Sequence, residues 1–464
     1  MGYSQELSRT MNRFSNFAIS FSIICILAGG ITSFQLAFST VGGAGIGLGW
    51  PVAGVFSFCT ALAMAQIASA FPTAGGLYHW ASILGGRGWG WITAWFNLAG
   101  LITVLAAINV GTANLIVGTL GPWLAPNSAT ADLVVLGGAA FLTLTQATAN
   151  HFGIRLTSKL TNFSGYLILG VTLALGASLL IFAPTLDPLR LVTFTNYSGP
   201  NGGDVWPHNP NLGWLFALGL LHAGYTITGF DASAHTAEET IAARENVPRG
   251  MISAVLVSGV VGWVLVCAIV LAMPDMDAAA KQGPNVFFWV VGQVVPPWLA
   301  LPILLGICLA NYLCGLATVT SASRMVYAFA RDGGLPFSRV LRRVSESHKV
   351  PAPAIWTVSA LAVAFMAYTP VYATITIVCV IFLYISYVLP VWLGLLAHGR
   401  TWTEMGPFSL GRWYRPVSLA CSIWCLLLLI IGAQPPYEKA IIIVSSVLAT
   451  MGVVWFIWPG ERRT

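Results

Sequence analysis

Long apolar stretches alternate with short polar or glycine-rich stretches along the whole chain. Each apolar stretch has about the 20 residues that a helix needs to cross the hydrocarbon core of a bilayer. The pattern predicts twelve membrane-spanning helices, over residues 15–40, 50–70, 88–118, 131–150, 160–183, 211–235, 250–273, 297–328, 353–369, 371–397, 415–433 and 438–459. The third and eighth are long enough to tilt strongly or to extend past the membrane.

Two predicted spans are interrupted. The first contains Gly29-Gly30 near its middle, and the sixth contains Gly229 followed by a carboxylate, Asp231. Broken helical backbone and a charge are both costly at membrane depth unless they face a cavity or a partner. The two interruptions therefore indicate a site rather than a purely structural feature.

The interrupted spans are five helices apart, so the second set of five enters the membrane from the opposite side. This arrangement predicts two inverted repeats, 14–183 and 211–397, and two additional helices in 415–459, within one membrane transport domain over 1–464. Interrupted helices at matching positions of inverted halves are typical of secondary transporters with a site near the bilayer midplane.

Composition supports an all-α polytopic membrane protein. Charged residues make up only 8% of the chain, against about 25% in soluble domains, and the mean hydropathy is +0.79. All eight cysteines fall in apolar segments, without the spacing of a metal site or a disulfide framework. We expect no cofactor, no metal and no nucleic-acid partner, because basic residues in membrane proteins mainly report topology.

The basic residues are distributed unevenly between the two sides. With the N-terminus in the cytoplasm, 18 of the 21 lysines and arginines fall on the inner side, and Arg190, Lys281 and Lys439 fall on the outer side. The positive-inside rule therefore predicts that both termini are cytoplasmic. We expect a multi-pass protein of the plasma (inner) membrane.

A break in each helix offers complementary backbone groups. The start of the half-helix after the first break would supply N–H donors for a carboxylate, from Gly29, Gly30, Ile31 and Thr32. Freed carbonyl groups at the sixth-span break would accept hydrogen bonds from an ammonium group or hold a cation, from Tyr225, Thr226 and Ile227. Tyr225 and Phe230 are candidate aromatic gates or cation–π partners.

Asp231 has two alternative roles. It binds a substrate amine or a proton, or it is a structural acceptor that caps the broken backbone. His235 and Glu239 follow at four-residue spacing, so the three share a helix face that conducts protons or simply reaches the cytoplasmic interface. Because Asp231 follows the break, the backbone over Tyr225–Gly229 is the better candidate for substrate contacts.

Other polar residues inside spans are weaker candidates, since most such residues join helices to one another. Asn97, Asn311 and Tyr384 are candidates for additional pocket residues, and the adjacent hydroxyls of Thr320 and Ser321 for a sodium site between the first and eighth spans. Proton and sodium are the candidate coupling ions, and exchange or facilitated diffusion without a coupling ion is the alternative.

An enzyme is the alternative from another functional class. A membrane-embedded metal or acid–base enzyme would use Asp231 with His222 or His235. The chain lacks a second carboxylate deep in a span and a metal-spaced histidine cluster, which counts against this hypothesis. A transporter-like sensor is a third hypothesis, although no cytosolic signalling domain accompanies the spans.

Four stretches resemble the amino acid–polyamine–organocation superfamily, and within it the amino acid/choline permease group. They are Ala28-Gly-Gly-Ile31, Phe71-Pro-Thr-Ala-Gly-Gly-Leu-Tyr78, residues 229–239 with Asn246-Val-Pro-Arg249, and residues 323–336. The resemblance covers nearly the whole chain.

The resemblance implies a LeuT-type fold, alternating access, and substrate contacts at both breaks, Ala28 included. The implied substrates are amino acids, γ-aminobutyrate (GABA), choline and polyamines. Two departures stand out, because Gly29 replaces the superfamily's serine and the middle of the fifth span, Tyr166–Val171, lacks the lysine that replaces sodium in some relatives.

Overall fold

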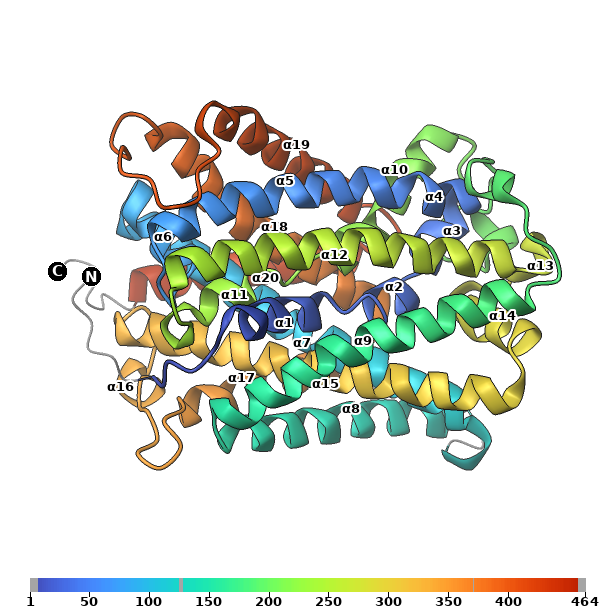
Figure 1. The fold of residues 1–464 in the computed structure, drawn as a ribbon, viewed down its shortest axis with the longest axis horizontal. Coiled ribbons are helices and arrows are strands. Elements are labelled where there is room, and N and C mark those ends of the chain that lie inside the picture. The colour runs from blue at the N-terminus through green and yellow to red at the C-terminus, as the bar shows by residue number, and fades with distance from the viewer. Residues whose placement is uncertain (1–6, 125–127, 370, 458–464) are drawn as a thin grey trace.

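The computed structural model describes residues 7–124, 128–369 and 371–457, and every regular element in these ranges is a helix. Figure 1 shows the long helices running side by side along the longest axis of the molecule. In the described part of the chain, ten helical segments are long and apolar enough to cross a membrane. The protein is therefore a multi-pass membrane protein, as the composition predicts.

The first half of the bundle covers the first five predicted spans. Its helices are α1 (Arg13–Ile24), α2 (Gly29–Thr32), α3 (Gln35–Val41), α4 (Gly43–Gly47), α5 (Gly49–Ala70), α6 (Leu77–Gly85), α7 (Arg87–Leu124), α8 (Ser128–His151) and α9 (Ile154–Phe182).

The second half begins after two short 3₁₀ turns, η1 (Pro188–Leu191) and η2 (Gly199–Gly202). Its elements are α10 (Leu212–Thr226), α11 (Ala232–His235), η3 (Ala237–Glu239), α12 (Ala243–Ala272), α13 (Met276–Ala280), η4 (Gly283–Asn285), α14 (Val286–Val294), α15 (Pro297–Arg331), α16 (Ser338–Leu341), α17 (Ala352–Tyr368), α18 (Tyr372–Ala397), η5 (Gly411–Trp413), α19 (Tyr414–Gly432) and α20 (Glu438–Ile457).

Helices occupy all twelve predicted positions, but two of them are short. α10 and α17 are apolar helices below the length that reliably spans a bilayer. The pattern did not predict the short helices α6, α13 and α14, which lie between spans. Short amphipathic segments of this kind lack the long apolar run on which the span prediction depends.

The break in the sixth predicted span lies where the sequence places it. α10 ends at Thr226 and α11 begins at Ala232, with Gly229 between them at φ +87°. A side chain there would be strained at that φ, and its Cβ would lie 2.2 Å from Cγ2 of Ile23. Glycine is therefore required by both the backbone conformation and the close approach of α1.

The break in the first span lies about one turn earlier than expected. α1 ends at Ile24, and Cys25 adopts a positive φ of 27°. The Gly29-Gly30 pair then starts α2 instead of forming the break. The pair was the visible signal because the residues that actually unwind, Cys25–Ala28, are ordinary apolar residues.

Neighbour relations between helices recur with an offset of five predicted spans. The third and tenth predicted spans (α7 and α18) pack together, and so do the eighth and fifth (α15 and α9). Likewise the first span packs on the seventh (α1 on α12), and the sixth packs on the second (α10 on α5). The pairs α8–α15 and α7–α17 match in the same way. The two broken spans lie at the centre of this arrangement.

Ion pairs join α15 and η3 at the end of the bundle where the described chain starts. We call this end the N-terminal end. Arg324 of α15 donates two hydrogen bonds to the Glu239 carboxylate, at 3.0 and 3.1 Å, and both side chains are fully buried. Next to this pair, Arg331 donates two hydrogen bonds to Glu238. The sequence prediction that Glu239 simply reaches an aqueous interface is therefore wrong, because Arg324 neutralises it inside the protein.

The opposite end is covered by the segment between α9 and α10. The Trp206 indole donates to the Leu36 carbonyl at 3.0 Å, and the Tyr197 hydroxyl donates to Asp277 at 2.7 Å. Burial and the neighbouring Asp277 carboxylate raise the pKa of Tyr197 well above its usual value. Tyr197 therefore remains a neutral hydrogen-bond donor at any physiological pH.

Removal of one partner of the buried ion pair should strongly destabilise the protein. Arg324→Met leaves the Glu239 charge buried and unpaired, which costs about 3–5 kcal/mol, and adding Glu239→Met should recover most of that loss. Unfolding of the purified protein in a denaturant titration measures the effect. The control is Arg249→Met, since Arg249 and Glu245 form an exposed pair at 3.9 Å that contributes about 0–1 kcal/mol. Equal stability of the two single variants would contradict this account.

Candidate functional site

The two helix breaks touch each other in the centre of the bundle. A Cβ atom added to Gly29 would lie 2.8 Å from Oγ1 and 2.9 Å from Cα of Thr226. A cavity of about 10 Å³ lies beside this contact, lined by Ile23, Ile24, Ala28, Gly29, Val104, Ile108, Tyr225, Thr226 and Thr228. This volume holds about one water molecule, so the site is closed around a space that is too small for an amino acid.

The first break leaves backbone donors free. Gly29 and Thr32 donate their N–H groups to the carbonyls of Cys25 and Ala28, at 3.1 and 2.9 Å. In the described ranges, the N–H groups of Gly30 and Ile31 have no acceptor. Two of the four predicted donors are therefore unpaired in the described chain.

The sixth-span break leaves backbone acceptors free. The Tyr225 carbonyl accepts a hydrogen bond from the Thr228 hydroxyl at 2.7 Å. No described residue donates to the carbonyls of Thr226 and Ile227. Free N–H groups at one break and free carbonyl groups at the other are the kinds of partner that the two ends of a zwitterion need. Of these four residues Thr226 lines the cavity, Gly30 and Ile227 lie beside lining residues in the chain, and Ile31 follows Gly30.

The side chain of Thr32 is engaged on the far side of the cavity. Its hydroxyl donates to the Ala28 carbonyl at 2.6 Å and shares a hydrogen bond with the Tyr372 hydroxyl of α18. The Tyr225 ring meets the Tyr372 ring edge to face, at 6.4 Å between centroids. Tyr225 therefore lies on the cavity wall next to Tyr372, and its role as a gate stays a prediction.

Asp231 is fully buried and does not line the cavity. Its carboxylate accepts hydrogen bonds from the Tyr387 hydroxyl at 2.8 Å and the Asn97 amide at 3.1 Å, and it lies 3.2 Å from Nε2 of His235. Asp231 thus joins α7, α18 and α11. The Phe230 ring packs on the Tyr387 ring and does not line the cavity.

Tyr387 contacts the sixth-span break, although the sequence offered no reason to place it in the candidate site. Its hydroxyl donates to Asp231 and accepts from the Gly229 N–H at 3.0 Å, so it replaces a helical hydrogen bond lost at the break. The only signal in the sequence is a tyrosine within an otherwise apolar span, and such tyrosines are common.

The other candidate pocket residues lie near the breaks but not on the cavity wall. Asn311 of α15 accepts a weak hydrogen bond from the Cys25 thiol, and the Tyr384 hydroxyl contacts Ser57 at 3.0 Å and the Gly224 carbonyl at 3.3 Å. Asn97 reaches the site only through Asp231. These residues support the broken backbone and do not contact the space inside it.

The two hydroxyls of the candidate sodium site are in different environments. The Thr320 hydroxyl donates to Asn150 of α8 at 2.7 Å, whereas the buried Ser321 hydroxyl has no hydrogen-bond partner in the described chain. For the enzyme hypothesis, the His222 ring lies 3.0 Å from the Ser33 hydroxyl. Within the described residues no group of three His, Cys, Asp or Glu side chains could hold a metal ion.

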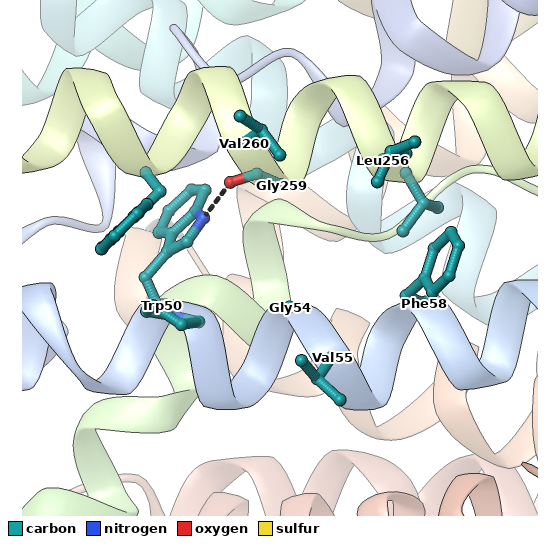
Figure 2. Close-up of a pocket in the computed structure, with 10 residues that line it drawn as sticks. Trp50, Gly54, Val55, Phe58, Leu256, Gly259 and Val260 are labelled. Carbon is teal, nitrogen blue, oxygen red and sulfur yellow. Dashed lines mark hydrogen bonds between the residues drawn. The ribbon is translucent and has the colours of Figure 1, made fainter.

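A second, larger recess lies between α5 and α12, and Figure 2 shows its lining side chains. Its walls are almost entirely carbon, and the Trp50 indole N–H is already bonded to the Gly259 carbonyl at 2.8 Å. A zwitterion in such a groove would lose its hydration without gaining partners. The cavity between the two breaks is therefore the candidate substrate site.

Comparison with known proteins now identifies the family. A family model described as "Amino acid permease" matches residues 11–458. This chain belongs to the amino acid permease family. The match confirms the resemblance to the amino acid–polyamine–organocation superfamily, and it makes the chain a transporter; the enzyme hypothesis has no support.

Relatives of the permease share most of its length. Amino-acid permease BAT1 of Arabidopsis thaliana is 34% identical and is aligned over 94% of this chain and 87% of its own. The BAT1 homolog of Oryza sativa subsp. japonica is 35% identical over 94% and 86%. The GABA-specific permease of Saccharomyces cerevisiae is 29% identical over 76% and 62%.

Two neighbouring glycines provide a matched test of the contact between the breaks. Gly29→Ala places a methyl group 2.9 Å from the Thr226 backbone, an overpacking that costs about 1–3 kcal/mol and should impair transport. Gly30→Ala meets nothing closer than 3.7 Å and should change stability by no more than about 0.5 kcal/mol. Thermal unfolding and uptake of both purified variants provide the measurement, and equal behaviour of the two would show that the breaks do not pack as described.

Proposed function

We propose that the permease is a secondary transporter that moves a small amino acid, or a closely related amine that carries a carboxylate, by alternating access. The observation that carries the proposal is the pairing of free N–H groups at Gly30 and Ile31 with free carbonyl groups at Thr226 and Ile227. A carboxylate suits the first pair and an ammonium group the second.

The same observation discriminates among the candidate substrate classes. Choline and polyamines have no carboxylate, so they would leave the two N–H groups unpaired inside the membrane, which costs free energy. α-Amino acids and GABA use both sets of groups. One relative bears the name GABA-specific permease, so GABA belongs in the substrate panel beside the neutral α-amino acids.

The closed cavity supports alternating access. Ion pairs seal the N-terminal end, and the Thr32–Tyr372 contact with the segment carrying Trp206 seals the other. A substrate can therefore enter or leave only after one end opens. We assign this conformation to an occluded state, with the centre collapsed onto a space of about 10 Å³.

The recurring neighbour relations between helices support the proposed inverted repeats. Several contacts that one set of five spans makes have a counterpart in the other set, as with α7–α18 and α15–α9. We propose a LeuT-type arrangement of repeats over 14–183 and 211–397, with α19 and α20 outside them. Opening would then be a movement of one repeat's helices against the other's.

The charge distribution supports the proposed orientation. Most basic residues lie at the N-terminal end of the bundle, which we place in the cytoplasm of a plasma (inner) membrane. Asp231 is proposed as an acceptor that holds the broken span together, because its oxygens already face three polar side chains. The substrate amine is left to the backbone carbonyl groups.

Counterflow in proteoliposomes tests the proposal. Vesicles loaded with an unlabelled substrate should take up the same labelled substrate from outside, and a panel of neutral amino acids, GABA, choline and putrescine defines the class. We expect exchange of at least one substrate that carries both an amine and a carboxylate, with choline and putrescine inactive. Exchange of choline or putrescine alone, or of nothing in the panel, would contradict the proposed function.

A further inference from the structure

His235 lies between two hydrogen-bond acceptors. Its Nδ1 is 3.3 Å from the Ala74 carbonyl oxygen, and its Nε2 is 3.2 Å from Oδ2 of Asp231. Both His235 and Asp231 are fully buried. The ring therefore connects the carboxylate at the sixth-span break with the segment between α5 and α6.

Both partners of the ring are hydrogen-bond acceptors, so two hydrogen bonds here need more than the single hydrogen of a neutral imidazole. A neutral imidazole has one N–H and one lone pair, so it cannot donate to two acceptors. Either both ring nitrogens carry hydrogen, or the extra hydrogen sits on Asp231 and the second ring nitrogen accepts it. In both cases the Asp231–His235 pair holds one proton more than a carboxylate beside a neutral imidazole, and its net charge is zero.

The other buried histidine of the same span shows the contrast. Nδ1 of His222 lies 3.0 Å from the Ser33 hydroxyl. The Ser33 hydroxyl already donates to the Gly29 carbonyl, so it accepts from Nδ1–H of a neutral His222, whose Nε2 has no hydrogen-bond partner in the described chain. The extra proton is therefore a property of the Asp231–His235 pair and not of buried histidines in general.

Most charged groups on the surrounding elements have partners of their own. α15 and η3 contribute two ion pairs, and α12 has an exposed pair and an arginine bonded to backbone. α7 contributes the Asn97 amide, and Arg87 at its start and Arg13 at the start of α1 are exposed. The paired groups are Arg324 with Glu239, Arg331 with Glu238, Arg249 with Glu245, Arg244 with the Ser69 carbonyl, and Asp332 with His79 and Tyr78. The titratable groups of α18 that face Asp231 are Tyr387 and Cys379.

Loss of the extra proton would change the packing of the N-terminal end. It would leave a net negative charge at a fully buried position, and it would remove a hydrogen bond either to Ala74 or to Asp231. The same segment packs tightly on the ring, since a Cβ on Gly76 would lie 3.3 Å from Nδ1 of His235. The proton is thus part of what keeps this segment docked on the sixth span.

We propose that the Asp231–His235 pair is a proton-binding site that couples proton movement to transport; this proposal rests on the proposed transport function. With the proton bound, the segment carrying Ala74 is held on His235 and the N-terminal end is closed. Release of the proton from the pair to water at that end frees the segment and opens the path. One proton then moves with each substrate molecule in the same direction, and no bond other than N–H or O–H is made or broken.

Two readouts in proteoliposomes separate coupling from a structural role. One is exchange of a transported substrate, found in the counterflow panel, at equal pH on both sides, which needs no net proton movement. The other is accumulation driven by a pH gradient of one unit at zero membrane potential, with internal pH followed by a trapped dye. One proton per substrate allows about tenfold accumulation, because one pH unit is a tenfold ratio.

Variants of the pair should affect accumulation and leave exchange intact. We expect His235→Gln and Asp231→Asn to retain exchange but to lose accumulation and the accompanying acidification. His222→Gln is the matched control and should keep its proton-to-substrate ratio whatever its rate. Tyr387→Phe removes a donor that favours the ionised carboxylate, so it should move the pH profile of transport to higher pH while accumulation persists.

The results distinguish failure of the proton-coupling proposal from failure of the proposed transport function. Wild-type exchange without proton-driven accumulation would overturn the inference and leave the proposed function standing, whereas absence of exchange would remove both. Accumulation that persists in His235→Gln and Asp231→Asn would show that the proton binds elsewhere. If neither variant folds, an unchanged pH profile in Tyr387→Phe overturns the inference by itself.

Discussion

The structure depends on the close approach of two unwound backbone segments inside the membrane. A bilayer interior offers no water, so every N–H and carbonyl group released by a helix break needs another partner. Side chains partner some of them, since the Ser20 hydroxyl donates to the Phe230 carbonyl and the Tyr387 hydroxyl accepts from the Gly229 N–H. The groups without a partner in the described chain include the N–H groups of Gly30 and Ile31 and the carbonyls of Thr226 and Ile227, which we propose as the substrate contacts.

This constraint links the centre to the two ends. The half of the sixth span that follows the break is only one turn of helix, α11, so its position depends on its neighbours. Asp231, His235 and Glu239 bond it to α18, to the segment before α6 and to α15, respectively. Movement of any of these neighbours is therefore transmitted to the backbone carbonyl groups at the break.

Most of the fold and part of the site could be predicted from the sequence. Hydrophobic length located the spans, and Gly229 with Asp231 located the sixth-span break, because glycine and charge are conspicuous in an apolar run. The first-span break was misplaced, since Cys25–Ala28 unwind without any unusual residue. The partners of Asp231 could not be predicted, because Asn97 and Tyr387 come from helices far away in sequence.

The same limit applies to Glu239 and to Thr320. Each was judged from its position along one helix, whereas its actual partner, Arg324 or Asn150, belongs to another. Periodicity within a helix tells which residues share a face, but it does not tell which helix lies opposite that face. Pairings across the bundle follow only from the three-dimensional arrangement.

The proposed substrate contacts can be tested by determining the structure of the permease with a transported amino acid bound. We expect the substrate carboxylate within hydrogen-bond distance of the Gly30 and Ile31 N–H groups, and the ammonium group at the Thr226 and Ile227 carbonyls. An ammonium group bound to the Asp231 carboxylate, or a substrate held between α5 and α12, would contradict the proposed contacts.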